Sequence, residues 1–118
     1  MKRDINLVRT ILLEIEKKEE PLGWIIPEIE GYSENEISYH IKILEEAGFV
    51  EARDLSTMGA FEWGAINLTW EGHEFLDASR SETIWNKTKS IIQEKMGSTS
   101  FEIIKELLIK TASTQLGL

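Results

Sequence analysis

The most informative stretch of the chain runs from Ser33 to Val50, S-E-N-E-I-S-Y-H-I-K-I-L-E-E-A-G-F-V. Ser33 and Glu36 have the spacing of a capping box, in which each side chain bonds the other residue's backbone N–H. Apolar residues recur at helical spacing along one face: Ile37, Ile41 and Leu44. Gly48 is free to take the positive φ that ends a helix. The pattern predicts a capped helix that passes directly into a strand, which is typical of the recognition helix of a winged helix-turn-helix domain.

The same helix carries a charge that opposes DNA binding. It holds four glutamates and one lysine, Lys42. Residues 21–56 contain eight acidic and two basic residues, and the expected wing segment from Ser56 to Gly64 has no lysine or arginine. DNA-binding domains are normally basic on the surface that meets phosphates. The predicted shape and the observed charge therefore point to different partners.

The elements on either side of this helix follow from periodicity and turn residues. Helical spacing predicts a first helix over about residues 3–19, ended by Pro21 and Gly23. Residues 24–31 are typical either of an edge strand or of a single helical turn. Two strands are expected over residues 49–55 and 62–68.

Three further helices are expected after the strands. Thr69 is placed to cap a helix over residues 70–78. Ser79 with Glu82, and Thr99 with Glu102, have capping-box spacing at the starts of the next two helices, and Gly97 ends the first of these. Two of the tryptophans are expected in the core: Trp70 and Trp85.

This order predicts an α+β fold, mainly α: a winged helix-turn-helix domain over residues 1–80 and a two-helix C-terminal extension over residues 81–118. The last helix has apolar residues on more than one side, so it needs a second surface to bury against. The extension either packs on the domain or forms a dimer interface, and we hold a homodimer through the C-terminal helices as one of the two solutions.

The pattern also carries two resemblances. I-S-Y-H-I-K-I-L-E-E-A-G-F-V (37–50) resembles the recognition helix of arsenical-repressor-like bacterial regulators. K-R-D-I-N-L-V-R-T-I-L-L-E-I-E (2–16), L-T-W-E-G-H-E-F-L-D-A (68–78) and T-I-W-N-K-T-K (83–89) resemble a family of small bacterial and phage-encoded proteins, domain of unknown function 2513. This resemblance implies a winged-helix fold and a phage or prophage setting. It implies no activity, because the family has none assigned.

In winged-helix regulators the outward positions of the recognition helix meet the major groove and the phosphates. Here the expected outward residues are Asn35, Ser38, Tyr39 and Lys42. Asn35 is suited to reading adenine, and Ser38 or Tyr39 to bonding phosphate. The chain departs from the regulators at Tyr39, where they tend to have arginine, and at Glu45, where a basic residue is common. An ordinary solvated helix face explains the same residues equally well.

The predicted wing offers a second kind of contact. Met58, Phe61 and Trp63 are apolar in a hairpin whose loop is normally exposed. Strand alternation places Phe61 and Trp63 on the face away from the core, unless a bulge at Gly64 turns them inward. If Phe61 and Trp63 are exposed, they form an aromatic patch of the kind that marks a protein contact.

Composition limits the remaining functions. The chain of 118 residues has no cysteine, which excludes disulfides, thiolate metal sites and a cysteine nucleophile. His40 and His73 fall on different elements and lack the spacing of a metal-binding helix. No segment approaches the length of a membrane span, and the net charge of −8 disfavours attraction to phosphate or anionic lipid. We expect a cytoplasmic, non-enzymatic protein with no cofactor, no metal and no membrane partner.

Two functions follow from these patterns. The leading hypothesis is a DNA-binding transcriptional regulator, because the order of elements and the Ser33–Val50 helix favour it. The alternative is an acidic protein-protein adaptor or a phage-encoded modulator of a host protein, because the helix is acidic and the wing is apolar. The expected partner is therefore either DNA or a host or phage protein.

Overall fold

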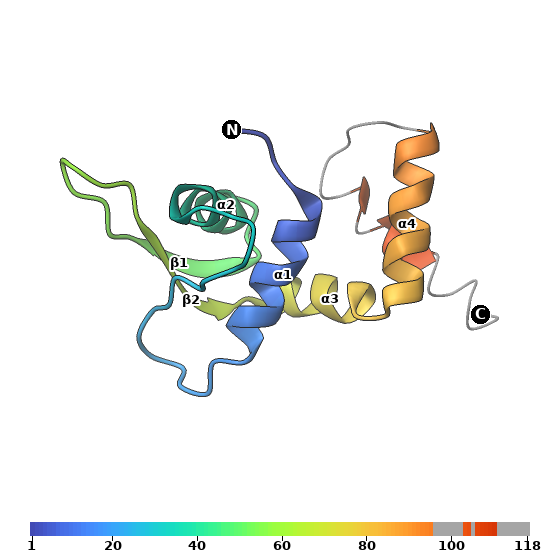
Figure 1. Cartoon of the computed structure of the whole chain (residues 1–118). Helices are drawn as coiled ribbons and strands as arrows, with labels where there is room; N and C mark the ends of the chain where they lie inside the picture. Colours follow the sequence, from blue (N-terminus) through green and yellow to red (C-terminus); the bar gives the residue numbers. More distant parts are fainter. Residues whose placement is uncertain (96–102, 105, 111–118) are drawn as a thin grey trace. The chain divides into compact units, whose positions relative to one another are not determined.

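The computed structural model describes residues 1–95, 103–104 and 106–110. The elements follow in the order α1 (Ile5–Glu16), α2 (Glu34–Glu46), β1 (Val50–Asp54), β2 (Trp63–Leu68), α3 (Trp70–Ser79) and α4 (Glu82–Lys95). The fold is α+β and mainly helical, with one two-stranded antiparallel sheet (Figure 1). The chain divides into two compact units, Met1–His73 and Glu74–Leu118.

Helix α2 forms as its sequence predicts. The Ser33 Oγ accepts the Glu36 backbone N–H at 3.1 Å, and the Glu36 carboxylate accepts the Ser33 N–H at 3.1 Å. Gly48 follows the helix with a φ of +82°. The predicted inward residues are buried: Ile37, Ile41 and Leu44. The predicted capping box, the glycine that ends the helix and the predicted buried face are therefore confirmed.

Helix α1 is shorter than predicted at both ends, because its N-cap is Asp4 and its C-cap is Lys17. The Asp4 Oδ1 accepts the backbone N–H groups of Asn6 and Leu7 at 2.9 and 3.2 Å. One face of the helix supplies buried apolar side chains: Leu7, Val8, Ile11, Leu12 and Ile15. Helix α1 contacts α2 and β2, and α2 contacts both strands, so the core of the first unit lies between the two helices and the hairpin (Figure 1).

Residues 17–33 contain no helix. The Ile25 N–H donates to the Ala65 carbonyl and the Ala65 N–H donates to the Ile25 carbonyl, both at 2.8 Å. Further on, the Tyr32 N–H donates to the Ile29 carbonyl at 3.2 Å, which closes a turn before α2. Of the two alternatives for this segment, the extended one is correct. Residues 17–33 therefore join α1 to α2 through a loop that carries a one-residue bridge to β2.

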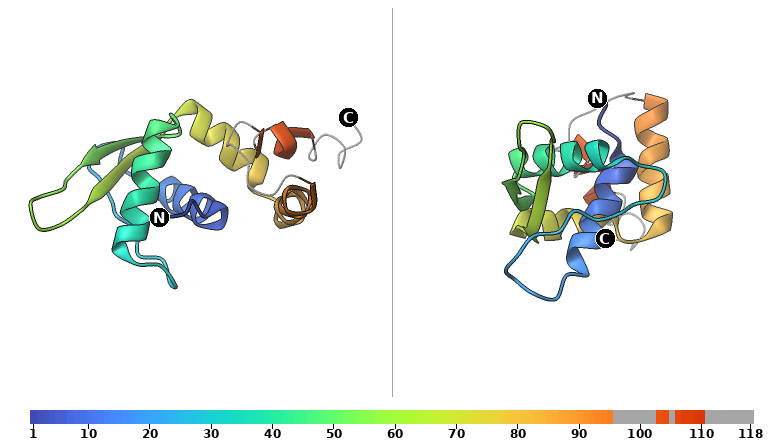
Figure 2. Two further views of the ribbon diagram at one scale, coloured as in Figure 1. Left: turned by 90° about the horizontal axis from the view of Figure 1, so that it is seen from above. Right: turned by 60° about the vertical axis from the view of Figure 1, so that its left-hand side comes forward.

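Strands β1 and β2 form a hairpin whose register shifts once. Glu51 pairs with Asn67, whereas Ala52 pairs with Ala65, so Ile66 is an extra residue. The sequence suggested a bulge at Gly64, but the bulge lies two residues later, at Ile66. An extra residue reverses the alternation of faces along the strand. The hairpin projects past α2, and its tip is closed by a bridge between Thr57 and Ala60 (Figure 2).

The hairpin passes into α3 at a corner built on the backbone of Phe49. The Thr69 N–H donates to the Phe49 carbonyl at 3.0 Å, and the Thr69 hydroxyl donates to the Gly48 carbonyl at 2.6 Å. The same hydroxyl accepts the Gly72 N–H at 3.1 Å, which confirms Thr69 as the cap. A Cβ at Gly72 would stand 2.0 Å from the Phe49 carbonyl oxygen. Position 72 therefore has no room for a side chain.

The predicted core role of Trp85 is confirmed, and that of Trp70 is wrong. Trp85 is 2 % exposed, and its ring meets that of Phe75 edge to face with centroids 6.3 Å apart. Trp70 is 77 % exposed. The buried positions of α3 form one stripe: Gly72, Phe75, Leu76 and Ser79. Trp70 falls off this stripe, so its ring points to solvent.

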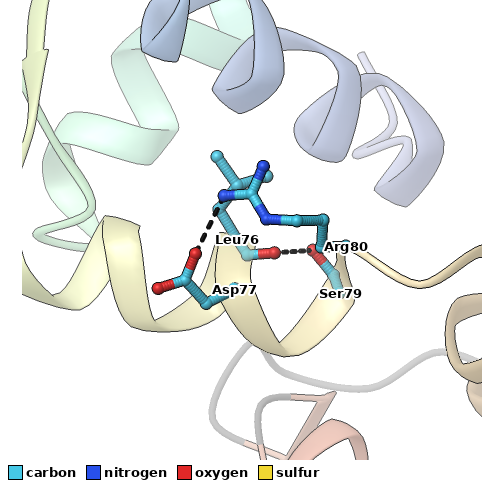
Figure 3. Close-up of polar contacts among 4 residues, drawn as sticks. All are labelled: Leu76, Asp77, Ser79 and Arg80. Atoms are coloured by element: carbon cyan, nitrogen blue, oxygen red, sulfur yellow. Dashed lines mark hydrogen bonds and ion pairs between the residues drawn. The ribbon is translucent and has the colours of Figure 1, made fainter.

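The predicted capping box of Ser79 with Glu82 is also wrong. Ser79 is the last residue of α3, and its hydroxyl donates to the Leu76 carbonyl at 3.1 Å (Figure 3). The Ile84 N–H instead donates to the Ser81 hydroxyl at 3.3 Å. Because Ser81 directly precedes α4, it is Ser81 that caps this helix.

Several predictions fall on residues outside the described ranges. These are the helix stop at Gly97 and the capping box of Thr99 with Glu102. In the described part of the last helical segment, Ile104 and Leu108 are buried and Ile109 is 49 % exposed. The homodimer stays a prediction. Within the described ranges, no helix combines the length and the apolar character needed to cross a membrane.

Candidate interaction site

The outward face of α2 carries three of the four residues proposed to meet DNA. Asn35 is exposed on the first turn, and Tyr39 is half-buried with its ring edge-on to that of His40. The Lys42 side chain is 36 % exposed. Positions three and four apart lie on one side of a helix. The structure therefore brings Asn35, Tyr39 and Lys42 into one stripe along α2.

The prediction that Ser38 faces outward is wrong. Ser38 is 1 % exposed, and its Oγ accepts the backbone N–H of Trp63 at 3.2 Å. The hydroxyl thus joins α2 to the first residue of β2. A phosphate has no access to this hydroxyl while the hairpin is in place, so Ser38 stabilises the packing of α2 on the hairpin instead.

Lys42, the one basic residue of α2, is already paired. Its Nζ donates to the Glu46 carboxylate at 2.7 Å, and this bond raises the pKa of Lys42 above its ordinary value. Glu34 and Glu45 are exposed on the same helix. A ligand that approaches α2 therefore meets carboxylates and a lysine whose charge is locally compensated.

Two other basic side chains are also paired with an acid that is close in sequence. The Lys17 Nζ lies 2.9 Å from the Glu14 carboxylate, and the Arg80 Nη2 lies 2.8 Å from that of Asp77 (Figure 3). In both pairs the acid is three residues before the base. These basic side chains are therefore held beside acidic neighbours in their own segment of the chain.

The hairpin presents apolar side chains, but not as the aromatic pair expected. Phe61 is 38 % exposed, whereas Trp63 is half-buried. The Trp63 indole Nε1 is itself buried and has no hydrogen-bond partner within the described residues. Met58 at the tip is fully exposed. The exposed apolar surface of the hairpin is therefore Met58 with Phe61, and we call these two residues the hairpin tip.

Strand β1 adds exposed acidic side chains to the hairpin. Glu51 and Asp54 are exposed on β1, together with Arg53. The Asp54 carboxylate accepts the Ser56 backbone N–H at 2.9 Å, and this bond lowers the pKa of Asp54. Asp54 is therefore ionised throughout the neutral range, and the hairpin adds to the negative charge of α2.

Comparison with known proteins identifies the family. The family model described as "Hypothetical protein (DUF2513)" matches residues 2–99. The chain belongs to the DUF2513 family. It is 40 % identical over 108 residues to an uncharacterized protein of Haemophilus influenzae (strain ATCC 51907 / DSM 11121 / KW20 / Rd), which covers 91 % of this chain and 92 % of that protein. No solved structure gives a significant match. The predicted resemblance to domain of unknown function 2513 is therefore confirmed, and no function comes with it.

Beneath α2, the DUF2513 chain is held together at Asp4. The His40 Nε2 accepts the Asp4 backbone N–H at 2.8 Å, so His40 Nδ1 carries the proton and donates to the Glu36 carbonyl at 2.8 Å. The Tyr32 hydroxyl donates to the Asp4 Oδ2 at 2.8 Å, and this bond raises the pKa of Tyr32. His40 Nε2 thus joins α2 to the cap of α1, while His40 Nδ1 bonds within α2 and holds the ring in place.

The other histidine offers no obvious site. His73 is exposed on α3, away from the stripe that the helix buries. Among the residues that the structure describes, no group of three or more His, Cys, Asp or Glu side chains is arranged to hold a metal ion. The surface formed by α2 and the hairpin tip is therefore the candidate site developed below.

Proposed function

We propose that this DUF2513 chain is a non-enzymatic module of winged-helix type, in which α2 and the hairpin contact a protein. In this proposal the hairpin is the wing and α2 takes the place of the recognition helix. The observation that carries the proposal is the pairing of Lys42 with Glu46 on an otherwise acidic helix face.

The winged-helix assignment rests on the order of elements. A helix, a bridging residue, a second helix, a hairpin and a third helix follow one another, and Ile25 is joined to β2 by an isolated bridge to Ala65. One departure is the missing helix between α1 and α2. In helix-turn-helix proteins the helix before the recognition helix crosses the DNA backbone. Its absence removes one of the elements that position the fold on DNA.

Charge argues further against DNA as the partner. Binding to duplex DNA is driven largely by release of counterions, and each released ion requires a lysine or arginine at a phosphate. Helix α2 carries Glu34, Glu36, Glu45 and Glu46. Two of these, Glu34 and Glu36, lie in the first turn, where a helix otherwise attracts anions. A phosphate at this end of α2 would be repelled rather than bound.

The hairpin tip supports a protein partner directly. Exposed apolar side chains framed by charged residues are typical of protein contact sites, whose centres are apolar and whose rims are polar. Met58 and Phe61 provide the apolar part, and the charged residues Arg53 and Asp54 are exposed at the end of β1 that leads into the same loop. The module is therefore suited to an adaptor role in which the hairpin tip enters an apolar pocket of a partner protein.

Photo-crosslinking tests this proposal. With a photoreactive amino acid in place of Met58, we expect one discrete protein adduct in extracts of the source organism. The matched control replaces Leu22, which is 80 % exposed in the loop after α1 and outside the proposed contact. The same adduct should be lost when Phe61→Ser is combined with the Met58 probe. Equal labelling from positions 58 and 22 would contradict the proposal.

A further inference from the structure

We propose that a groove beside α2 binds an extended, lysine- or arginine-bearing peptide segment of the partner protein. This inference rests on the proposed function, because it names the chemistry of the partner. The groove has a volume of about 760 Å³. It is lined by residues 26–32 of the loop, by three residues of the first turns of α2 and by Glu62 of the hairpin.

The floor of the groove is apolar. It is formed by Ile26, Pro27 and Ile29 from the loop and by Ile37 from α2. Ile37 is fully enclosed, whereas the three loop residues are half-buried and keep accessible surface. Aliphatic stems of lysine or arginine, or the apolar residues between them, gain free energy by covering such surface, at roughly 25 cal/mol per Å².

The rim of the groove carries one sign of charge. Its ionisable residues of that sign are Glu28, Glu30, Glu34 and Glu62, and its lining includes no lysine, arginine or histidine. Within the described residues none of these four carboxylates has a hydrogen-bonded or ion-pair partner. Four unpaired carboxylates around an apolar floor favour a cationic occupant and repel an anionic one.

The backbone of the loop favours a peptide as the form of that occupant. Ile25 already pairs with β2 in the manner of a strand. Beyond it, the backbone N–H groups of Glu28 and Glu30 donate no hydrogen bond within the described residues. An extended peptide laid along this loop would pair with such groups while its basic side chains reach the rim, as in recognition by strand addition.

The test measures binding of fluorescent peptides to the full chain by anisotropy. The probe is a short peptide in which lysine alternates with leucine, compared with glutamate–leucine and lysine–serine counterparts. Only the lysine–leucine peptide should bind well, at low salt and, more weakly, at about 0.15 M salt. Absence of its binding, or equal binding of either counterpart, would overturn the proposal.

Charge reversal locates the binding. The variant Glu28→Lys with Glu30→Lys should weaken the affinity for the lysine–leucine peptide by about tenfold or more, because it places like charges opposite each other. The control, Glu19→Lys with Glu20→Lys, makes the same change of net charge in another exposed stretch outside the groove. Its affinity should stay within about twofold of the unmodified chain, since distant exposed charges are screened.

The apolar floor is tested in the same assay, and the outcomes are separable from those of the proposed function. Ile29→Ser should weaken peptide binding, whereas Leu22→Ser, in the exposed loop before it, should not.

Equal losses of peptide affinity in both charge-reversal variants would mean that bulk charge attracts the peptide, and would overturn the proposed groove. Crosslinking from Met58, which does not line the groove, would persist in that case. If the peptide binds in the groove but the Met58 probe gives no discrete adduct, the result would contradict the proposed function and not the groove.

Discussion

Replacing Gly72 with alanine is expected to lower the free energy of unfolding by at least about 3 kcal/mol, at the upper end of the costs of overpacking. The new Cβ would stand 2.0 Å from the Phe49 carbonyl oxygen and 3.0 Å from its carbonyl carbon. That carbonyl is held in place because it accepts the Thr69 N–H. Alanine's higher helix propensity returns only about 1 kcal/mol. Urea unfolding followed by circular dichroism measures the loss.

The matched control is Gly59→Ala in the hairpin loop. A Cβ at Gly59 meets no heavy atom within 4 Å, and its φ lies outside the left-handed region. We expect a change within about 0.5 kcal/mol, as for other surface substitutions. If Gly72→Ala unfolds at the same urea concentration as Gly59→Ala, the close contact between α3 and the backbone of Phe49 is wrong.

Truncating Trp85 to alanine is expected to cost about 3–5 kcal/mol of stability in the second unit. The indole is 2 % exposed and meets the Phe75 ring edge to face, with ring planes at 76°. Its removal gives up buried apolar surface and leaves a cavity against Phe75. Thermal unfolding followed by near-ultraviolet circular dichroism reports on the packing of the aromatic rings.

Trp70→Ala is the matched control, because Trp70 is also a helical tryptophan but is 77 % exposed. We expect it to change stability by no more than about 0.5 kcal/mol. Comparable losses in the two variants would mean that Trp70 is buried in solution, and would contradict the position of the buried stripe on α3.

Features set by residues close in sequence could be predicted without the structure. The capping box of Ser33 and Glu36, the positive φ of Gly48 and the cap by Thr69 each depend on contacts within about four residues. The stripe of Asn35, Tyr39 and Lys42 follows from helical spacing alone. These local features, and the shared face of the three side chains, were predicted correctly for that reason.

Features set by distant residues could not be read from the sequence. Ser38 is buried because the hairpin covers it and the Trp63 N–H bonds its hydroxyl, 25 residues away. Ile25 pairs with Ala65 rather than starting a helix, because β2 offers it two backbone hydrogen bonds. The groove arises only when this loop lies beside α2. No periodicity in the sequence contains that information.

Measurement of duplex DNA binding distinguishes a protein partner of α2 and the hairpin from DNA. Anisotropy is measured with labelled duplexes of mixed sequence and of the gene's own upstream region, at about 50 mM salt and again at about 200 mM. We expect no saturable binding with a dissociation constant below about 10⁻⁴ M, which is the weak end of the range for non-specific DNA binding. Saturable binding that falls steeply with salt, and that is lost in Lys42→Glu but kept in Lys17→Glu, would contradict the proposal of a protein partner.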